Sequence, residues 1–318
     1  MHDRTFLLSL AAAHALDAPA LERLRALAGL NHEPPALAQQ LRRGLALCAG
    51  VLGALGLIFW IAANWDLLGR FGRFALLQAA FLVCCTGCLL RGPARPAFGV
   101  LALAAIGGQL AYFGQTYQTG ADPWQLFALW AVLALPLCWH VRSDWLWLPW
   151  SGLSALAIQL WLAAHGSSPF GGAASLLGLD LAAWGLHGAL ALWLSPLLSA
   201  HTGAGRWAWR SASSFAILVV CLSGAVAAWQ PHTEARFVLA AAVLMLGLAA
   251  ARGRDLFIVC ACLFALDVLA MSLASRLLLN QAHGEVIGAM FLLTSLGAGL
   301  LSLSVSWVMK QVRAAEGA

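Results

Sequence analysis

Ten apolar segments follow one another along this 318-residue chain, and each has close to the roughly 17–25 residues that a helix needs to cross a bilayer. Hydrophobic residues make up 62% of the chain and charged residues 10%, compared with roughly 25% charged residues in soluble domains. A soluble fold cannot bury so much apolar surface. The sequence therefore predicts an all-α, polytopic transmembrane helical bundle of about ten spans. The expected spans are 44–63, 71–90, 97–114, 124–141, 145–164, 174–198, 211–230, 235–251, 255–275 and 286–309.

The basic residues test this count independently. With the amino terminus inside, fourteen of the eighteen Lys and Arg residues fall on the inner side, and only Arg70, Arg73, Arg236 and Arg276 fall outside. This excess is the positive-inside bias of membrane proteins. Seventeen of the eighteen are Arg, in a chain rich in Ala, Leu and Gly, which indicates a bacterial source. The predicted location is the bacterial cytoplasmic (inner) membrane, with both termini in the cytoplasm.

The residues before the first span form a short helical headpiece. Residues 5–15 and 19–29 predict two amphipathic helices, and Asp17 is the expected N-cap of the second. Pro34 and Pro35 mark a break before a third helical stretch that runs into the membrane. The predicted domains are a cytoplasmic headpiece (1–43), a transmembrane domain (44–309) and a short cytoplasmic tail (310–318).

The expected partners follow from this layout. Membrane lipids surround the spans, and the headpiece at residues 1–43 is a candidate docking element for a protein. The basic residues lie scattered in pairs rather than in one patch, which argues against binding to nucleic acid.

Polar side chains within the spans are the first candidates for function, because burying them in hydrocarbon is costly. Asp267 lies about twelve residues into the ninth span, roughly 18 Å from its inner end. Asp180 and His187 share one face of the sixth span, at i and i+7. Gln109 lies in the third span. These four residues are a candidate intramembrane polar site; the alternative is that each bonds to a neighbouring helix and only stabilises packing.

The densest polar stretch is the predicted outer loop between the third and fourth spans. Its side chains could hydrogen-bond or stack against a sugar, a peptide or a lipid headgroup. In the alternative interpretation this is an interfacial turn, in which Asp122 caps the next helix and Pro123 takes its first position. The candidate binding residues are Gln115, Tyr117, Gln118, Asp122 and Trp124.

Motifs for catalysis or metal binding are missing from the sequence. All eight cysteines fall inside apolar spans, and neither the Cys85–Cys88 pair nor the Cys260–Cys262 pair has a His or Cys partner at the spacing of a metal site. Neither a phosphate-binding Gly loop nor a nucleophile elbow is found. We therefore expect no catalytic residues, no metal and no cofactor.

Three groups of residues around the predicted outer loop carry a resemblance to a known family: Asn64–Trp65, Gly108–Gln118 with Ala121–Asp122, and Leu126–Trp130 with Leu135–Leu137. They resemble the domain-of-unknown-function 2157 family of predicted bacterial membrane proteins. The resemblance covers about residues 5–150 and includes the headpiece. It implies a membrane protein but no activity, because the family has no established catalytic or binding residues.

Three functions are compatible with these features. The first is a transporter- or channel-like role for a small solute or a lipid, based on the number of spans and the polar groups at mid-membrane. The second is a non-catalytic scaffold or assembly factor of the envelope. The third is a membrane enzyme that acts on a lipid-linked substrate, although the sequence favours a non-enzymatic protein. Convergence of Asp267, Asp180, His187 and Gln109 on one water-accessible cavity would favour transport, whereas separate packed contacts would favour the scaffold.

Overall fold

The computed structural model describes residues 13–14, 17–27, 35–64, 67–90, 92–117, 120, 122–166, 173–281 and 286–316, and this part of the chain contains helices and no strands. A helix lies at each of the ten predicted spans. Nine of these ten helices have, within the described ranges, a stretch that is long and apolar enough to cross a membrane. The tenth helix, at the sixth predicted span, is α8. The helices are α2 (Ala18–Leu27), α3 (Pro35–Ala63), α4 (Arg70–Leu89), α5 (Arg95–Tyr117), α6 (Pro123–Val141), α7 (Asp144–Gly166), α8 (Ala173–Trp193), α9 (Ser199–Thr202), α10 (Arg206–Ala227), α11 (Glu234–Ala251), α12 (Leu256–Gln281) and α13 (Val286–Glu316).

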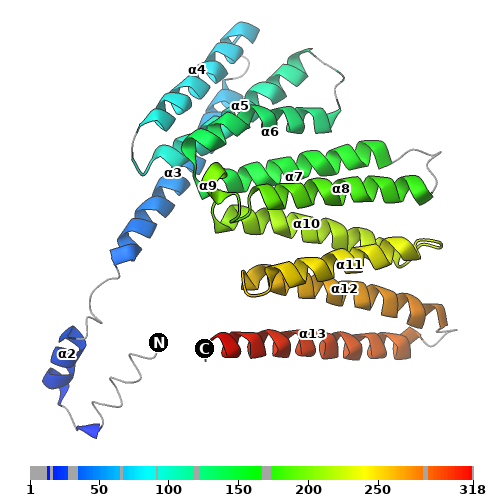
Figure 1. The fold of residues 1–318 in the computed structure, drawn as a ribbon. Coiled ribbons are helices and arrows are strands. Elements are labelled where there is room, and N and C mark those ends of the chain that lie inside the picture. Colours follow the sequence, from blue (N-terminus) through cyan, green and yellow to red (C-terminus); the bar gives the residue numbers. More distant parts are fainter. Residues whose placement is uncertain are drawn as a thin grey trace.

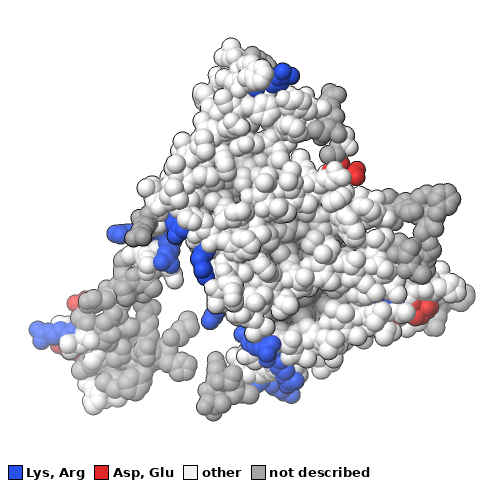
Figure 2. Space-filling model, turned by 45° about the horizontal axis from the view of Figure 1, so that its top comes forward, with Lys and Arg blue, Asp and Glu red and all other residues white. Residues whose placement is uncertain are grey.

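The long helices form one bundle of antiparallel neighbours (Figure 1). Helices α7, α8 and α10 to α13 lie side by side with their axes nearly aligned, and α3, α4 and α5 are inclined to them. The chain alternates between two ends of the bundle. We call one end the arginine-rich face; it holds Arg42, Arg43, Arg95, Arg142, Arg206, Arg210, Arg252, Arg254, Lys310 and Arg313. Between the charged ends, the surface is broad and uncharged (Figure 2), as lipid contact requires.

The headpiece is described in part. The predicted helix at 19–29 is confirmed by α2, and the backbone N–H of Ala20 donates to Asp17 Oδ1 at 3.0 Å, as an N-cap does. Most of the predicted helix at 5–15 lies outside the described residues. Helix α3 then begins at Pro35 and passes residue 43 as continuous helix. Helix α2 stands apart from the bundle in Figure 1.

Several helix ends differ from the predicted span ends: α12 and α13, for example, continue to Gln281 and Glu316. The ends of α8 and α5 have a local cause. Helix α8 stops at Trp193 and not at residue 198, because Pro196 cannot continue it and a turn leads into the short α9. Helix α5 continues to Tyr117 and so takes in the first part of the expected loop. The Thr116 hydroxyl bonds to the Tyr112 carbonyl at 2.7 Å, and Tyr117 packs on Phe113 one turn below, which together extend the helix.

Burial is concentrated in the centre of the bundle. The largest cluster of buried residues is formed by α4, α5, α6, α7, α8 and α10, and it contains the fully buried Trp147. A second cluster is formed by α8, α10, α11 and α12. Small residues allow this close approach: a Cβ on Gly107 of α5 would lie 2.2 Å from the Trp130 ring of α6. Burial falls toward the first and last spans: 44% of the residues in the most apolar stretch of α7 are buried, but none in that of α3 and 6% in that of α13.

Candidate functional site

Asp180 of α8 forms an ion pair with Arg236 of α11. The carboxylate is buried, and the Arg236 side chain is 14% exposed. Arg236 lies in the first turn of its helix, at the end of the bundle opposite the arginine-rich face. A single charged group is costly to bury in hydrocarbon, and the opposite charges of the carboxylate and the guanidinium compensate each other. The pair therefore joins α8 to α11.

Two further side chains on the same face of α8 contact two other helices. The Trp184 indole N–H donates to Ser223 Oγ of α10 at 3.0 Å. His187 is fully buried; its Nδ1 lies 2.8 Å from the Ala183 carbonyl and its Nε2 lies 3.4 Å from Gln159 Nε2 of α7. Three polar residues on one face of α8 thus contact three different helices.

Asp267 and Gln109 lie in other parts of the bundle. Ser304 of α13 donates to both carboxylate oxygens of Asp267 on α12, at 3.1 and 2.8 Å. The Gln109 amide of α5 is 3.5 Å from the Leu77 carbonyl of α4. Each residue therefore contacts a helix next to its own.

The four intramembrane candidates thus contact four different helices: α11, α7, α13 and α4. None of the four lines either of the two cavities described below. Within the described ranges, no three His, Cys, Asp or Glu side chains come together as metal ligands would. The structure brings Asp180 and His187 onto one helix face, and it does not bring them together with Asp267 or Gln109.

The outer-loop candidates lie at the facing ends of two helices. Gln115 and Tyr117 are exposed in the last turn of α5, and Gln118 lies outside the described residues. Asp122 occupies the N-cap position of α6 without a side-chain cap bond. Trp124 packs edge-on against His165, with ring centroids 6.0 Å apart, and its buried indole N–H has no hydrogen-bond partner in the described part of the chain.

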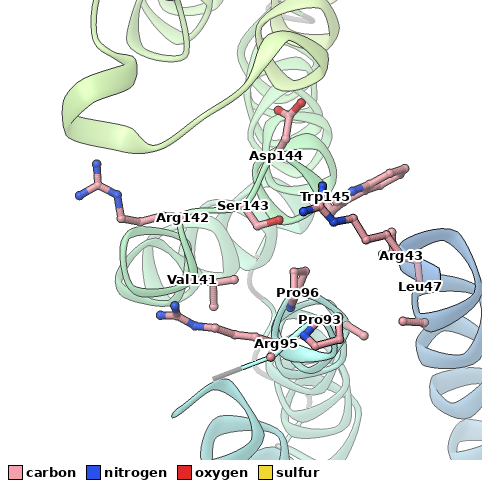
Figure 3. A pocket seen from close by; sticks show the side chains of 13 residues that line it. Arg43, Leu47, Pro93, Arg95, Pro96, Val141, Arg142, Ser143, Asp144 and Trp145 are labelled. Atoms are coloured by element: carbon pink, nitrogen blue, oxygen red, sulfur yellow. The ribbon is translucent and has the colours of Figure 1, made fainter. Parts of the chain in front are cut away.

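A cavity of about 430 Å³ opens at the arginine-rich face, and we call it the arginine cavity (Figure 3). It lies where α3, the start of α5 and the turn from α6 to α7 meet. Arg43 extends from α3 toward Trp145 across this space in Figure 3. The lining residues are Arg43, Ala46, Leu47, Gly92, Pro93, Arg95, Pro96, Ala97, Val141, Arg142, Ser143, Asp144 and Trp145.

Backbone contacts fix three of these side chains. Arg95 donates through Nε to the Cys88 carbonyl at 3.0 Å and through Nη2 to the His140 carbonyl, which ties the ends of α4 and α6 to α5. Arg142 donates to the Ala200 carbonyl of α9. Asp144 accepts backbone N–H bonds from Gly205, Trp207 and Ala208 at 2.9 to 3.0 Å, at the start of α10.

These contacts leave the cavity electropositive. The one carboxylate in its lining, Asp144, points away from it toward α10 in Figure 3 and is satisfied by backbone donors there. Arg43 is exposed and has no ion-pair or hydrogen-bond partner among the described residues. Each guanidinium carries five N–H donors, so Arg95 keeps donors beyond the two it uses.

A second cavity of about 350 Å³ lies between α8, α10, α11 and α12. Most of its lining is apolar, with Trp184 deep in the bundle and Arg254 at the arginine-rich face. Arg254, in the turn after α11, donates to the Ala250 carbonyl of that helix at 3.0 Å.

A comparison with models of known protein families supports the family resemblance predicted from the sequence. Residues 9–147 match the family described as "Predicted membrane protein (DUF2157)". This confirms the predicted resemblance, and the matched region covers the span from the headpiece to the start of α7, including the arginine cavity's lining. The chain matches no curated protein and no solved structure. The protein is thus an integral membrane protein with several spans.

Sequence reasoning missed the arginine cavity. Arg43, Arg95 and Arg142 were used only to orient the spans, because each sits in a different inner segment. The signal that could have found them is the recurrence of Arg in three successive inner segments, before the first span, between the second and third, and after the fourth.

Proposed function

We propose that this protein is a non-catalytic scaffold of the bacterial cytoplasmic membrane, with both termini in the cytoplasm and a headpiece that docks a protein partner. One observation carries the proposal: each of the four intramembrane polar candidates is engaged with a different neighbouring helix. Bonds of this kind hold a bundle together. A transport path would use such groups in a common hydrated cavity.

The headpiece supplies the docking element. Helix α2 stands clear of the bundle (Figure 1), and Leu27 at its end is 87% exposed. Leu21 and Leu24 recur at the spacing of one helical face, so α2 presents an apolar stripe. A helix of this kind binds in the groove of a partner protein.

The experiment compares the 318-residue chain with a variant that lacks residues 1–34. This deletion stops directly before Pro35, where α3 begins. Both are expressed in the native host, solubilised mildly and separated on a native gel. We expect the complete chain to migrate in a larger complex and the shortened chain to lose it while keeping its unfolding temperature. The double variant Leu21→Glu/Leu24→Glu should act like the deletion, and Glu22→Gln on the polar face should act like wild type.

Two results would contradict the scaffold. One is a complex of unchanged size after the deletion. The other is an ion flux in proteoliposomes that exceeds empty vesicles and disappears in Asp267→Asn or Asp180→Asn, which would favour the transport role for a small solute or lipid instead.

A further inference from the structure

We propose that the arginine cavity binds the phosphate of an anionic phospholipid headgroup. This site is independent of the scaffold role, because it involves neither α2 nor the intramembrane polar residues. Three arginines line this cavity: Arg43, Arg95 and Arg142. The Arg43 guanidinium extends into it, whereas Arg95 and Arg142 add positive charge from its wall while they donate to backbone carbonyls.

The charge of the cavity is uncompensated. Asp144 is occupied by three backbone N–H donors of the α9–α10 turn and the start of α10, and it faces that side in Figure 3. Arg43 has no partner in the described ranges and extends over the opening. An anion there would gain the unused N–H donors of Arg43 and those that Arg95 retains.

The position suits a lipid rather than a deeply bound solute. The cavity lies at the end of the spans, where headgroups lie, and the half-exposed Trp145 indole on its rim is typical of that depth. Helix α3, which forms one wall, is exposed along its apolar stretch, so an acyl chain could lie along it. Basic pockets between transmembrane helices at the cytoplasmic side are a known mode of binding anionic headgroups.

Size and helix polarity agree with this ligand. A volume of about 430 Å³ lies within the roughly 300–1,000 Å³ typical of small-ligand sites. Helices α5 and α7 both begin at the cavity, so the positive ends of two helix dipoles point toward it and add to the arginines.

The test is native mass spectrometry of the purified protein with equal amounts of phosphatidylglycerol or phosphatidylcholine. We expect wild type to retain phosphatidylglycerol under activation that removes phosphatidylcholine. Arg43→Gln should lower the retained fraction about five-fold, the equivalent of roughly 1 kcal/mol per arginine near a membrane surface. Arg43→Glu should lower it further, and Arg43→Lys should keep most of it.

Arg42→Gln is the matched control. Arg42 is the preceding residue on α3, equally exposed, but does not line the cavity. It should leave lipid retention unchanged. Because Arg43 is exposed, its variants should unfold at the wild-type temperature, which separates lost binding from lost folding.

Three outcomes would overturn the proposal. Equal losses in Arg42→Gln and Arg43→Gln would mean a diffuse attraction to the whole basic face. Both lipids carry a phosphate, and only phosphatidylglycerol has a net negative headgroup, so equal retention of the two would mean that the cavity does not select an anionic headgroup. Stabilisation of lipid-free protein by inorganic phosphate, with displacement of phosphatidylglycerol, would make a free phosphate the ligand instead of a headgroup.

Discussion

The first and second halves of the bundle use different bonds between helices. Between α4, α5, α6 and α7 the acceptors in the described residues are backbone carbonyls and not carboxylates. The Trp130 indole bonds to the Leu103 carbonyl and the Trp150 indole to the Ala131 carbonyl, both at 2.8 Å, and the charged Arg95 likewise donates to carbonyls at the helix ends. From α8 onward carboxylates take part. Asp180 pairs with Arg236, Arg210 with Asp255, and Asp267 accepts from Ser304.

The difference teaches where stability is most sensitive to a single change. Losing one neutral donor leaves a carbonyl that already accepts a bond within its own helix. Losing one member of a buried ion pair leaves an unpaired charge, which costs far more than the pair itself contributes. The second half should therefore be the more fragile to substitution of polar residues, and it also holds six of the seven buried polar or charged residues in the described part of the chain.

The largest effect is expected for Asp180→Leu. The substitution leaves the Arg236 guanidinium buried without its carboxylate, and the free energy of unfolding should fall by about 3–5 kcal/mol. Denaturant unfolding in detergent micelles measures this loss. Asp180→Leu/Arg236→Leu should recover most of it, because two apolar residues need no partner. The control is Glu234→Gln: Glu234 is exposed on α11, the helix of Arg236, and its substitution should leave the free energy of unfolding unchanged. A loss below about 1 kcal/mol in Asp180→Leu would contradict the difference between the two halves.

A smaller effect is expected for Trp150→Phe in the first half. The N–H bond to the Ala131 carbonyl is lost, and the phenyl ring fills less of the core than the buried indole did. Hydrogen bonds between membrane helices contribute about 0.6 kcal/mol on average and at most about 1.7 kcal/mol, so the total cost should stay well below that of Asp180→Leu. Trp139→Phe is the matched control, because Trp139 is 43% exposed. The same unfolding assay applies, and a loss as large as that of Asp180→Leu would show that neutral bonds are no weaker than charged ones.

The smallest effect is expected for Asp267→Asn. The Asn carbonyl can still accept from Ser304, so the free energy of unfolding should change by less than about 0.5 kcal/mol. Asp267→Leu, which removes the acceptor, should lose about 1–2 kcal/mol. Equal stability of the Asn and Leu variants would show that the contact between α12 and α13 does not depend on this hydrogen bond.

Much of the fold could be predicted because lipid imposes a simple rule. Every long apolar segment must satisfy its backbone within itself, so it forms a helix, and the charges at its ends set its direction. Local chemistry was also readable: Asp17 caps α2 as expected from its position before Pro19. The end of α8 was misplaced because hydropathy continues past Pro196, whereas the helix does not.

The sequence alone determined that this is an all-helical membrane protein and which side chains share a helix face, such as Asp180, Trp184 and His187. Only the tertiary structure decided which helix each of them contacts. Arg236 is 56 residues from Asp180, and Arg43 and Trp145 meet at one cavity from separate spans. Periodicity fixes the direction of a side chain relative to its own helix axis, but helices in lipid are ordered by close packing between them, which no single segment encodes.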